Sequence, residues 1–375
     1  MFVFKVFNLL FLLKKITLFG TLGKRCQRTT CIYFILLNSD FILYIILEQN
    51  KLTSKRILIT GGAGFIGSNL CEKFLAQDNK VVCLDDFSMG RRENIAHLLD
   101  NPNFTLIEGD IRKLEDCKKA VSNVELILHQ AALGSVPRSI ADPTTSNDVN
   151  ISGFVNVLVA AKEAGIKRIV YAASSSTYGN HKALPKIEEN IGRPLSPYAV
   201  TKYVNELYAN VFSDLYGLEI IGLRYFNVFG RKQRPDGAYA AVIPKFIGLL
   251  MEHKQPTIFG EGDFSRDFTY IENVLQANEL AATTTNPDAI NQVYNVAFGE
   301  RTTVKEMFEL MRSLLSKYDS KISEIEAIYS DNRQGDIPHS LASIEKAQKL
   351  LGYSPQFSFK KGLTEAIDWY WEDLK

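Results

Sequence analysis

RILITGGAGFIGSNL (residues 56–70) joins a short apolar run to three spaced glycines and the start of an amphipathic segment. The apolar run predicts a buried strand over 57–60, and the residues after the glycines predict a helix. Gly61 allows a tight turn between the two, Gly64 lets backbone approach a pyrophosphate, and Gly67 lets the helix pack on the sheet. The first N–H groups of such a helix attract phosphates. This stretch therefore predicts a dinucleotide-binding turn.

Strand and helix signals alternate from this turn as far as Asn227. Further strands are expected at VVCLDD (81–86), FTLIEGD (104–110), ELILHQAA (125–132), RIVYAASS (168–175) and LEIIGLRYFN (218–227), with helices over 65–75, 149–164 and 197–215. Buried strands joined by helical crossovers predict an α/β fold, a Rossmann-like doubly wound parallel sheet.

The pattern changes after Asn227 to short strands, loops and helices, with NQVYNVA (291–297) predicted as one more strand of the same sheet. We expect a Rossmann domain over 51–227, with strand 291–297 added to its sheet. A smaller, mixed α/β substrate domain is expected over 228–375.

The first fifty residues are far more apolar than the rest of the chain. MFVFKVFNLLFLL (1–13) is too short to span a membrane, and no small-residue cleavage site follows it. CIYFILLNSDFILYIIL (31–47) is marginal in length, and Asp40 at its centre costs about 2.5–3.5 kcal/mol on insertion scales. Residues 1–50 are thus a membrane-associating hairpin, a disordered tail or translated upstream sequence outside the native protein. We favour the third interpretation, and expect membrane association only if the segment is native.

The composition argues against several classes of partner. The formal net charge is +1, and no basic run with interleaved aromatic residues favours nucleic acid. The five cysteines form no CxxC pair, which predicts reduced thiols in a cytoplasmic protein. The histidines are scattered without metal-ligand spacing, so we predict no metal.

Asp85 ends the second predicted strand, at the distance expected for a carboxylate that binds a ribose 2′-hydroxyl. A carboxylate there repels a 2′-phosphate, so NAD is expected in preference to NADP. Arg91 and Arg92 are the counter-argument, and we interpret them as solvated loop residues. At the same sheet edge, Asp110-Ile111 and Gln130-Ala131-Ala132 are expected to meet the adenine and the nicotinamide ribose. We also assign to the cofactor Phe65, Ile66, Asn150, Tyr198, Lys202 and Tyr225.

SPYAVTKYVNELY (196–208) places Tyr198 and Lys202 four residues apart, on one face of a helix. The lysine charge, added to that of an oxidised nicotinamide, stabilises a tyrosinate, so Tyr198 can act as a base near neutral pH. Tyrosine and lysine share this spacing on many helices by chance. Ser174 and Ser175 at the preceding strand end strengthen the prediction, because a hydroxyl there can hold the oxygen that Tyr198 deprotonates.

These motifs resemble the extended short-chain dehydrogenase/reductase family over nearly all of residues 55–375. The resemblance is strongest to bacterial UDP-N-acetylglucosamine 4-epimerases of surface-polysaccharide biosynthesis. It is carried by HQAALGSVPRS (129–139), YAASSSTYG (171–179), SPYAVTKYVNELYA (196–209), LRYFNVFGRKQ (223–233) and GAYAAVIPK (237–245). The resemblance implies tightly held NAD and reversible inversion at C4 of a UDP-N-acetylhexosamine, through a 4-keto sugar.

The resemblance also implies individual roles. Tyr198 deprotonates the 4-hydroxyl, Lys202 binds the nicotinamide ribose, and Ser174, with Ser175 beside it, holds the 4-oxygen. Arg266 and Arg333 match phosphate-binding arginines, whose planar fork suits phosphate oxygens, and Asp336 matches a ribose-binding carboxylate. Further substrate contacts are assigned to Ser135, Asn227, Ala241, Val242, Lys245 and Ser340.

Two local features bear on the substrate and the reaction. Ser340 matches a position that carries a bulky side chain in epimerases restricted to unacetylated hexoses, so an N-acetyl group is expected to fit. The sequence leaves open whether the 6-position of the sugar is a hydroxymethyl group or the carboxylate of a uronic acid. Related dehydratases and decarboxylases carry a carboxylate just after the catalytic hydroxyl, where this chain has Ser175-Ser176-Thr177. The alternatives are a UDP-sugar 4,6-dehydratase or uronate decarboxylase and, in another class, a non-catalytic NAD-binding scaffold. The resemblance also implies a homodimer through helices 149–164 and 197–215.

Overall fold

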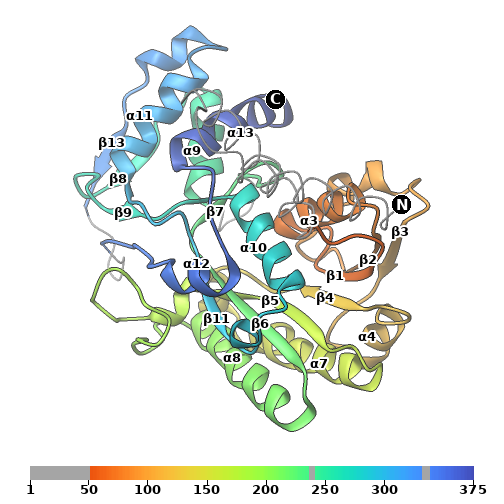
Figure 1. Cartoon of the computed structure of the whole chain (residues 1–375). Coiled ribbons are helices and arrows are strands. Elements are labelled where there is room, and N and C mark those ends of the chain that lie inside the picture. The colour runs from red at the N-terminus through yellow and green to blue at the C-terminus, as the bar shows by residue number, and fades with distance from the viewer. Residues whose placement is uncertain (1–50, 236–240, 332–337) are drawn as a thin grey trace, which may run out of the picture. The chain divides into compact units, whose positions relative to one another are not determined.

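The computed structural model describes residues 51–235, 241–331 and 338–375 (Figure 1). Residues 51–375 form one compact unit, and their predicted division into two domains at residue 227 stays a prediction. The three interpretations of residues 1–50 fall outside the described residues. Within the described ranges, no helix combines the length and the apolar character needed to cross a membrane.

A seven-stranded parallel sheet forms the centre of this unit, which confirms the predicted doubly wound α/β fold (Figure 1). Its strand order is β11-β6-β5-β4-β1-β2-β3. The strands are β1 (Arg56–Thr60), β2 (Lys80–Asp85), β3 (Phe104–Glu108), β4 (Leu126–His129), β5 (Arg168–Ser174), β6 (Glu219–Tyr225) and β11 (Val293–Val296). The order reverses between β1 and β4, and a ligand crevice is expected beyond the carboxyl ends of the strands at such a switch point.

Helices cover both faces of the sheet (Figure 1). Successive residues of β1 enter different apolar clusters, Ile57 and Ile59 one and Leu58 the other, because side chains alternate along a strand. The first cluster includes α3 (Phe65–Leu75) and α10 (Ile271–Thr283). The second includes α4 (Leu114–Ala120), α7 (Gly153–Glu163) and α8 (Pro197–Tyr216).

The predicted helix over 149–164 differs at its start, where a π-helical turn (Asp148–Ser152) precedes α7. The helix predicted over 197–215 matches α8 closely. The Ser196 hydroxyl accepts the Ala199 N–H, Pro197 occupies the first turn, and Gly217 ends the helix in the left-handed conformation. These signals fix where α8 begins, and so place Tyr198 in its first turn.

The C-terminal third combines helices with short two-stranded sheets. Its helices are α9 (Val242–Met251), α11 (Val304–Leu315), α12 (Glu345–Leu351) and α13 (Phe359–Asp373). Its short sheets pair β7 (Val228–Phe229) with β10 (Thr269–Tyr270), β8 (Thr257–Phe259) with β13 (Ile328–Ser330), and β9 (Ser265–Arg266) with β12 (Thr302–Thr303). Side chains of α9, α11 and α13 share the apolar cluster of α3, so this region packs directly on the sheet.

Candidate active site

The glycine turn between β1 and α3 is tightly enclosed by backbone. Gly61 has φ +66°, and a Cβ there would lie 2.7 Å from the Ala131 nitrogen. A Cβ on Gly67 would lie 2.1 Å from the Gly61 carbonyl oxygen. Side chains are therefore excluded at both positions, and the turn lies against the chain that leaves β4. Gly64 caps the N-terminus of α3.

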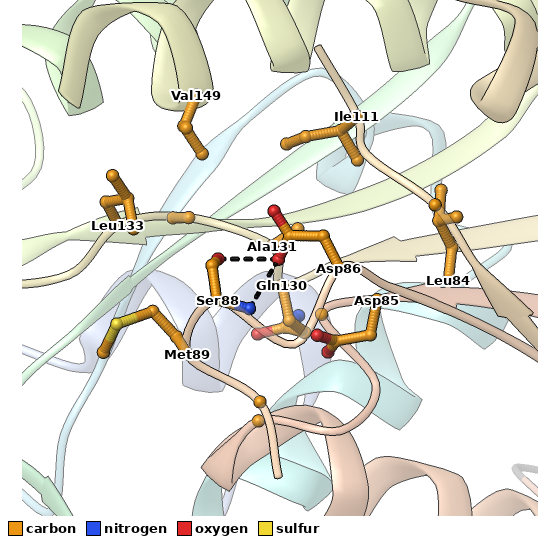
Figure 2. A pocket seen from close by; sticks show the side chains of 15 residues that line it. Leu84, Asp85, Asp86, Ser88, Met89, Ile111, Gln130, Ala131, Leu133 and Val149 are labelled. Carbon is orange, nitrogen blue, oxygen red and sulfur yellow. Dashed lines mark hydrogen bonds between the residues drawn. The ribbon is translucent and has the colours of Figure 1, made fainter. Parts of the chain in front are cut away.

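A cavity at the carboxyl edge of the sheet, here called the edge cavity, opens beside this turn (Figure 2). Its lining comes from the glycine turn, from the loops after β2, β3 and β4, and from the start of the π-helical turn. The lining residues are Gly61, Gly64, Leu84, Asp85, Asp86, Ser88, Met89, Gly90, Gly109, Ile111, Gln130, Ala131, Ala132, Leu133 and Val149.

Asp85 lines the edge cavity, and backbone N–H groups hold its carboxylate. It accepts hydrogen bonds from the N–H groups of Ala63 (2.9 Å) and Phe87 (2.8 Å). Burial raises its pKa, and these two hydrogen bonds oppose that shift. Asp86 accepts hydrogen bonds from the Ser88 N–H and hydroxyl, which closes the loop after β2 (Figure 2).

Three residues of the loop after β2 were not predicted as site residues. Ser88, Met89 and Gly90 line the edge cavity. The available signal was their position, because they follow Asp85 directly and loops after parallel strands gather at one edge.

Five more of the predicted cofactor residues lie at or beside the edge cavity. Ile111, Gln130, Ala131 and Ala132 line the edge cavity. The Asp110 carboxylate pairs with Arg112 at 2.7 Å, which lowers its pKa despite partial burial, and its neighbours Gly109 and Ile111 line the cavity.

Asn150 and Tyr225 are both engaged with protein groups. Asn150 accepts the Leu133 N–H (2.8 Å) and donates to the Leu133 carbonyl and the Thr201 hydroxyl, so it ties the loop after β4 to α8. Tyr225 is hydrogen-bonded to Gln130 and Asn278. The assignments of Asp110, Asn150 and Tyr225 to cofactor binding stay predictions.

These features fit a bound dinucleotide. The glycine turn and the N-terminus of α3 would hold the pyrophosphate, and Asp85 would accept from the adenosine ribose. Arg92 is turned toward β3, where it forms two hydrogen bonds with the Glu108 carboxylate (2.8 and 2.7 Å). Arg91 lines a second cavity, described below, rather than pointing freely into solvent.

Tyr198, Ser174 and Lys202 come together at the carboxyl end of β5. The Ser174 hydroxyl lies close enough to the Tyr198 phenol to lower its pKa. The Lys202 ammonium donates to the Ala172 carbonyl oxygen at 2.7 Å. The Ser176 hydroxyl donates to the Ser174 hydroxyl at 2.8 Å. Ser175 begins the 3₁₀ turn that follows β5 (Ser175–Tyr178).

Burial sets the proton affinities of this cluster. It raises the pKa of Tyr198, although the nearby Ser174 hydroxyl opposes the shift. It lowers the pKa of Lys202 to about 8. The sequence predicted a lowered pKa for Tyr198, and in the protein alone desolvation outweighs that effect. A tyrosinate therefore depends on the positive charge that an oxidised nicotinamide would add.

The second cavity adjoins the edge cavity, with which it shares Ser88, Met89 and Gly90. Its described lining holds four cationic side chains and no acidic one. The lining residues are Phe65, Phe87, Ser88, Met89, Gly90, Arg91, Asn94, Gly134, Ser135, Arg138, Lys232, Gln233, Arg234 and Ala241. Glu72 and Asp373 pair with Lys232 and Arg234 from outside the lining.

The predicted substrate residues lie in three places. Ser135 and Ala241 line the second cavity; Ser135 caps α5 (Val136–Ala141), whereas Ala241 caps α9, on which Val242 and Lys245 lie. Asn227 donates to the Asp267 carbonyl oxygen at 2.9 Å.

Arg266 and Ser340 are held by backbone near each other. Arg266 donates to the carbonyl oxygens of Ser265 (3.0 Å) and Pro338 (3.1 Å), and the Ser340 N–H donates to Ser265 (3.0 Å). Arg333 and Asp336 fall outside the described residues.

Comparison with known proteins agrees with this geometry. Residues 57–297 match the NAD dependent epimerase/dehydratase family. The chain is 36% identical over 315 residues to a putative UDP-glucose 4-epimerase from Methanocaldococcus jannaschii, covering 84% of this chain and 97% of the relative.

Two solved structures are similar over comparable lengths. A UDP-N-acetylglucosamine 4-epimerase from Methanobrevibacter ruminantium, in complex with UDP-N-acetylmuramic acid, is 37% identical with a TM-score of 0.79, covering 86% of this chain and all of that one. A UDP-glucuronic acid 4-epimerase from Bacillus cereus, in complex with UDP-glucuronic acid and NAD, is 32% identical with a TM-score of 0.74, covering 84% and 99%.

Asp85→Asn tests the ribose contact. Removing the charge while keeping the shape should raise the Kd for NAD by about 10- to 100-fold, the range for a hydrogen bond to a charged group. Isothermal titration of nucleotide-free protein measures this. Asp100→Asn, at an exposed carboxylate outside the edge-cavity lining, is the matched control, and its Kd should stay close to wild type. An unchanged Kd in folded Asp85→Asn protein would remove Asp85 from the ribose site.

Lys202→Met tests the cost of the buried ammonium. Lys202 is 2% exposed with a pKa of about 8, so the folded protein at pH 7 desolvates a charge that the unfolded chain exposes. The variant without nucleotide should gain roughly 1–3 kcal/mol in free energy of unfolding while losing activity. Urea unfolding measures this, and Lys245→Met, on an exposed lysine, should stay within about 0.5 kcal/mol of wild type.

The pH dependence of the same difference has a definite sign. The folded pKa lies below the unfolded value of about 10.4, so between about pH 8 and 10.4 the unfolded chain binds more protons. The free energy of unfolding of wild type therefore rises relative to that of Lys202→Met as the pH increases through this window, and the difference between the two proteins narrows. A difference that widens with pH would contradict the assignment.

Proposed function

The chain belongs to the NAD-dependent epimerase/dehydratase family, and we propose that it is a UDP-sugar 4-epimerase acting on UDP-N-acetylglucosamine and UDP-N-acetylgalactosamine, or on their uronic acids. The observation that carries the proposal is the convergence of Tyr198, Ser174 and Lys202 at the carboxyl end of β5. A reversible oxidation at C4 needs a base, a group that holds the 4-oxygen and a cation, and these three residues supply them.

The residues act in a defined order around the sugar. Bound NAD supplies the hydride acceptor for C4 and later the hydride donor. Tyr198 removes the proton from the 4-hydroxyl as the carbonyl forms, and returns it when the opposite face of C4 is reduced. Ser174 holds the 4-oxygen at both stages, and its own orientation is fixed by Ser176. Lys202 keeps a positive charge close to the tyrosinate.

Inversion also requires that the sugar turns over while the nucleotide stays bound. The cationic lining of the second cavity and the Arg266 guanidinium offer binding for a diphosphate. The same cationic lining can also bind a sugar carboxylate, so the proposal includes the uronic acids as substrates. Ser340 is small and leaves room for an N-acetyl group.

An epimerase is favoured over a dehydratase or decarboxylase by the turn after Ser174. Ser175, Ser176 and Thr177 occupy that turn, and none of them can act as the acid or base that elimination needs. A cytoplasmic location, serving surface-polysaccharide synthesis, is part of the proposal. It is supported by the free, buried thiols of Cys71, Cys83 and Cys117.

We further propose a homodimer formed through α7 and α8. The outer face of α8 carries Val200, Leu207, Val211 and Leu215, which are between 46% and 67% exposed. Their spacing of seven, four and four residues places them on one stripe, as in helices that pack on another protein surface.

Tyr198→Phe tests the reaction. Without the phenol, interconversion of the sugars should fall by at least about 10²–10⁴-fold, the usual contribution of general acid–base catalysis. Purified protein is incubated separately with UDP-N-acetylglucosamine, UDP-N-acetylgalactosamine and their two uronic acids, and inversion at C4 is followed by NMR. Tyr203→Phe, on the same helix, is the control and should retain activity.

Two outcomes would overturn the proposal. Undiminished inversion in folded Tyr198→Phe protein would remove the assigned base. Products that differ in mass from the substrate would identify elimination or decarboxylation instead of epimerisation.

The dimer is tested by Leu207→Glu combined with Val211→Glu. Burying two carboxylates on this stripe is unfavourable, so light scattering should give the mass of a dimer for wild type and of a monomer for the variant. Ile328→Glu, at a comparably exposed apolar residue on β13, is the control and should leave the dimer intact. A wild-type monomer would exclude the interface.

A further inference from the structure

Three polar side chains from distant parts of the chain close a ring of hydrogen bonds beside the edge cavity. The Tyr225 hydroxyl donates to Gln130 Oε1 at 3.2 Å. Gln130 Nε2 donates to Asn278 Oδ1 at 3.2 Å. Asn278 Nδ2 donates back to the Tyr225 hydroxyl at 2.9 Å. Each residue thus donates one hydrogen bond within the ring and accepts one.

The ring runs in a single direction, so reversing any one group breaks it. A flipped Gln130 amide would place its N–H groups toward the Tyr225 hydrogen. A flipped Asn278 amide would place its oxygen toward the Val274 carbonyl oxygen and its N–H groups toward Gln130 Nε2. Burial raises the pKa of Tyr225 to about 12, so its hydroxyl keeps the proton that it donates. Asn278 is fully buried, and its Nδ2 also donates to the Val274 carbonyl oxygen at 2.8 Å. Bonds arranged head to tail in this way polarise and strengthen one another.

The position of the ring links it to the cofactor and to the catalytic cluster. Gln130 lines the edge cavity (Figure 2). Tyr225 ends β6 and is the register partner of Ser174 on β5. Asn278 lies on α10, which packs on the sheet face that carries α3. One buried residue of a covering helix therefore reaches, through Tyr225 and Gln130, both the cofactor side and the catalytic end of the site.

We propose that Asn278 is a positioning residue for the dinucleotide: by closing the ring, it fixes the amide orientation of Gln130 in the wall of the edge cavity. Gln130 has two Nε2 hydrogens, and the ring uses one of them, so the other is held in a constant direction. Without Asn278 the Gln130 side chain regains rotamers that must be lost again whenever the dinucleotide binds. The proposal requires NAD binding alone and holds whichever sugar is turned over.

Asn278→Ala tests this role, and the chain supplies a matched control on the same helix. Asn273 is also buried, at 1% exposure, but it holds the loop of Gln356 and Phe357 through its own hydrogen bonds. Thermal unfolding and the Kd for NAD are measured for Asn278→Ala and Asn273→Ala in the nucleotide-free full chain. Both variants should lose stability, and only Asn278→Ala should weaken NAD binding, by about ten-fold or more. Equal Kd changes in the two variants, or no change in either, would overturn the proposal.

Tyr225→Phe keeps the test decisive if Asn278→Ala does not fold, because it removes one hydroxyl and leaves the packing intact. It should also weaken NAD binding. A double-mutant cycle then separates the ring from a direct contact between Tyr225 and the dinucleotide. If both residues act through one ring, the Asn278→Ala/Tyr225→Phe variant should bind NAD no more weakly than the weaker single variant. Additive losses, or a wild-type Kd in Tyr225→Phe, would contradict the proposal.

Discussion

The close approach of the Gly61 turn to the Ala131 backbone is the constraint on which the rest of the site depends. It exists because β1 and β4 are sheet neighbours whose connections leave in opposite directions, and a hydrogen bond between Thr60 and His129 (2.8 Å) joins their ends. Any side chain at Gly61 would push the two loops apart. Asp85, Gln130 and Ser174 then follow from the sheet order, because each ends or follows a parallel strand that meets this edge.

Burial shifts the pKa values of Tyr198 and Lys202, and the desolvation of their charged forms reduces the stability of the folded protein. The charged forms of both Tyr198 and Lys202 are disfavoured by desolvation, so the protein alone prefers a neutral phenol and weakens its hold on the lysine proton. A cationic nicotinamide beside them would reverse the preference of the tyrosine. The desolvation penalty on the tyrosinate would therefore be offset only when the cofactor is bound, as expected where a site is selected for function over stability.

The sequence predicted the local features well, because these follow from short-range rules. The strands, the glycine turn and the start of α8 are set by apolar runs, backbone freedom and capping at Ser196. It also predicted that Tyr198, Ser174 and Lys202 would lie together. It could not predict that Asn278 joins Gln130 and Tyr225, since these residues are separated by at least 53 positions and their meeting depends on how α10 lies on the sheet. The raised pKa of Tyr198 was missed for the same reason, because desolvation is a property of the packed molecule.

β5 lies between two supports that approach its carboxyl end from opposite faces of the sheet. On one side α8 brings Lys202 to the Ala172 carbonyl oxygen. Ala209 and Phe212 of the same helix belong to the apolar cluster that contains Phe154 and Tyr171. On the other side α10 holds Tyr225, the register partner of Ser174, through Asn278. One support therefore acts on the strand of Ser174 itself, and the other acts on the strand beside it. In the proposed mechanism Ser174 is the point past which the sugar turns over, and support on both faces of the sheet favours a constant position for it.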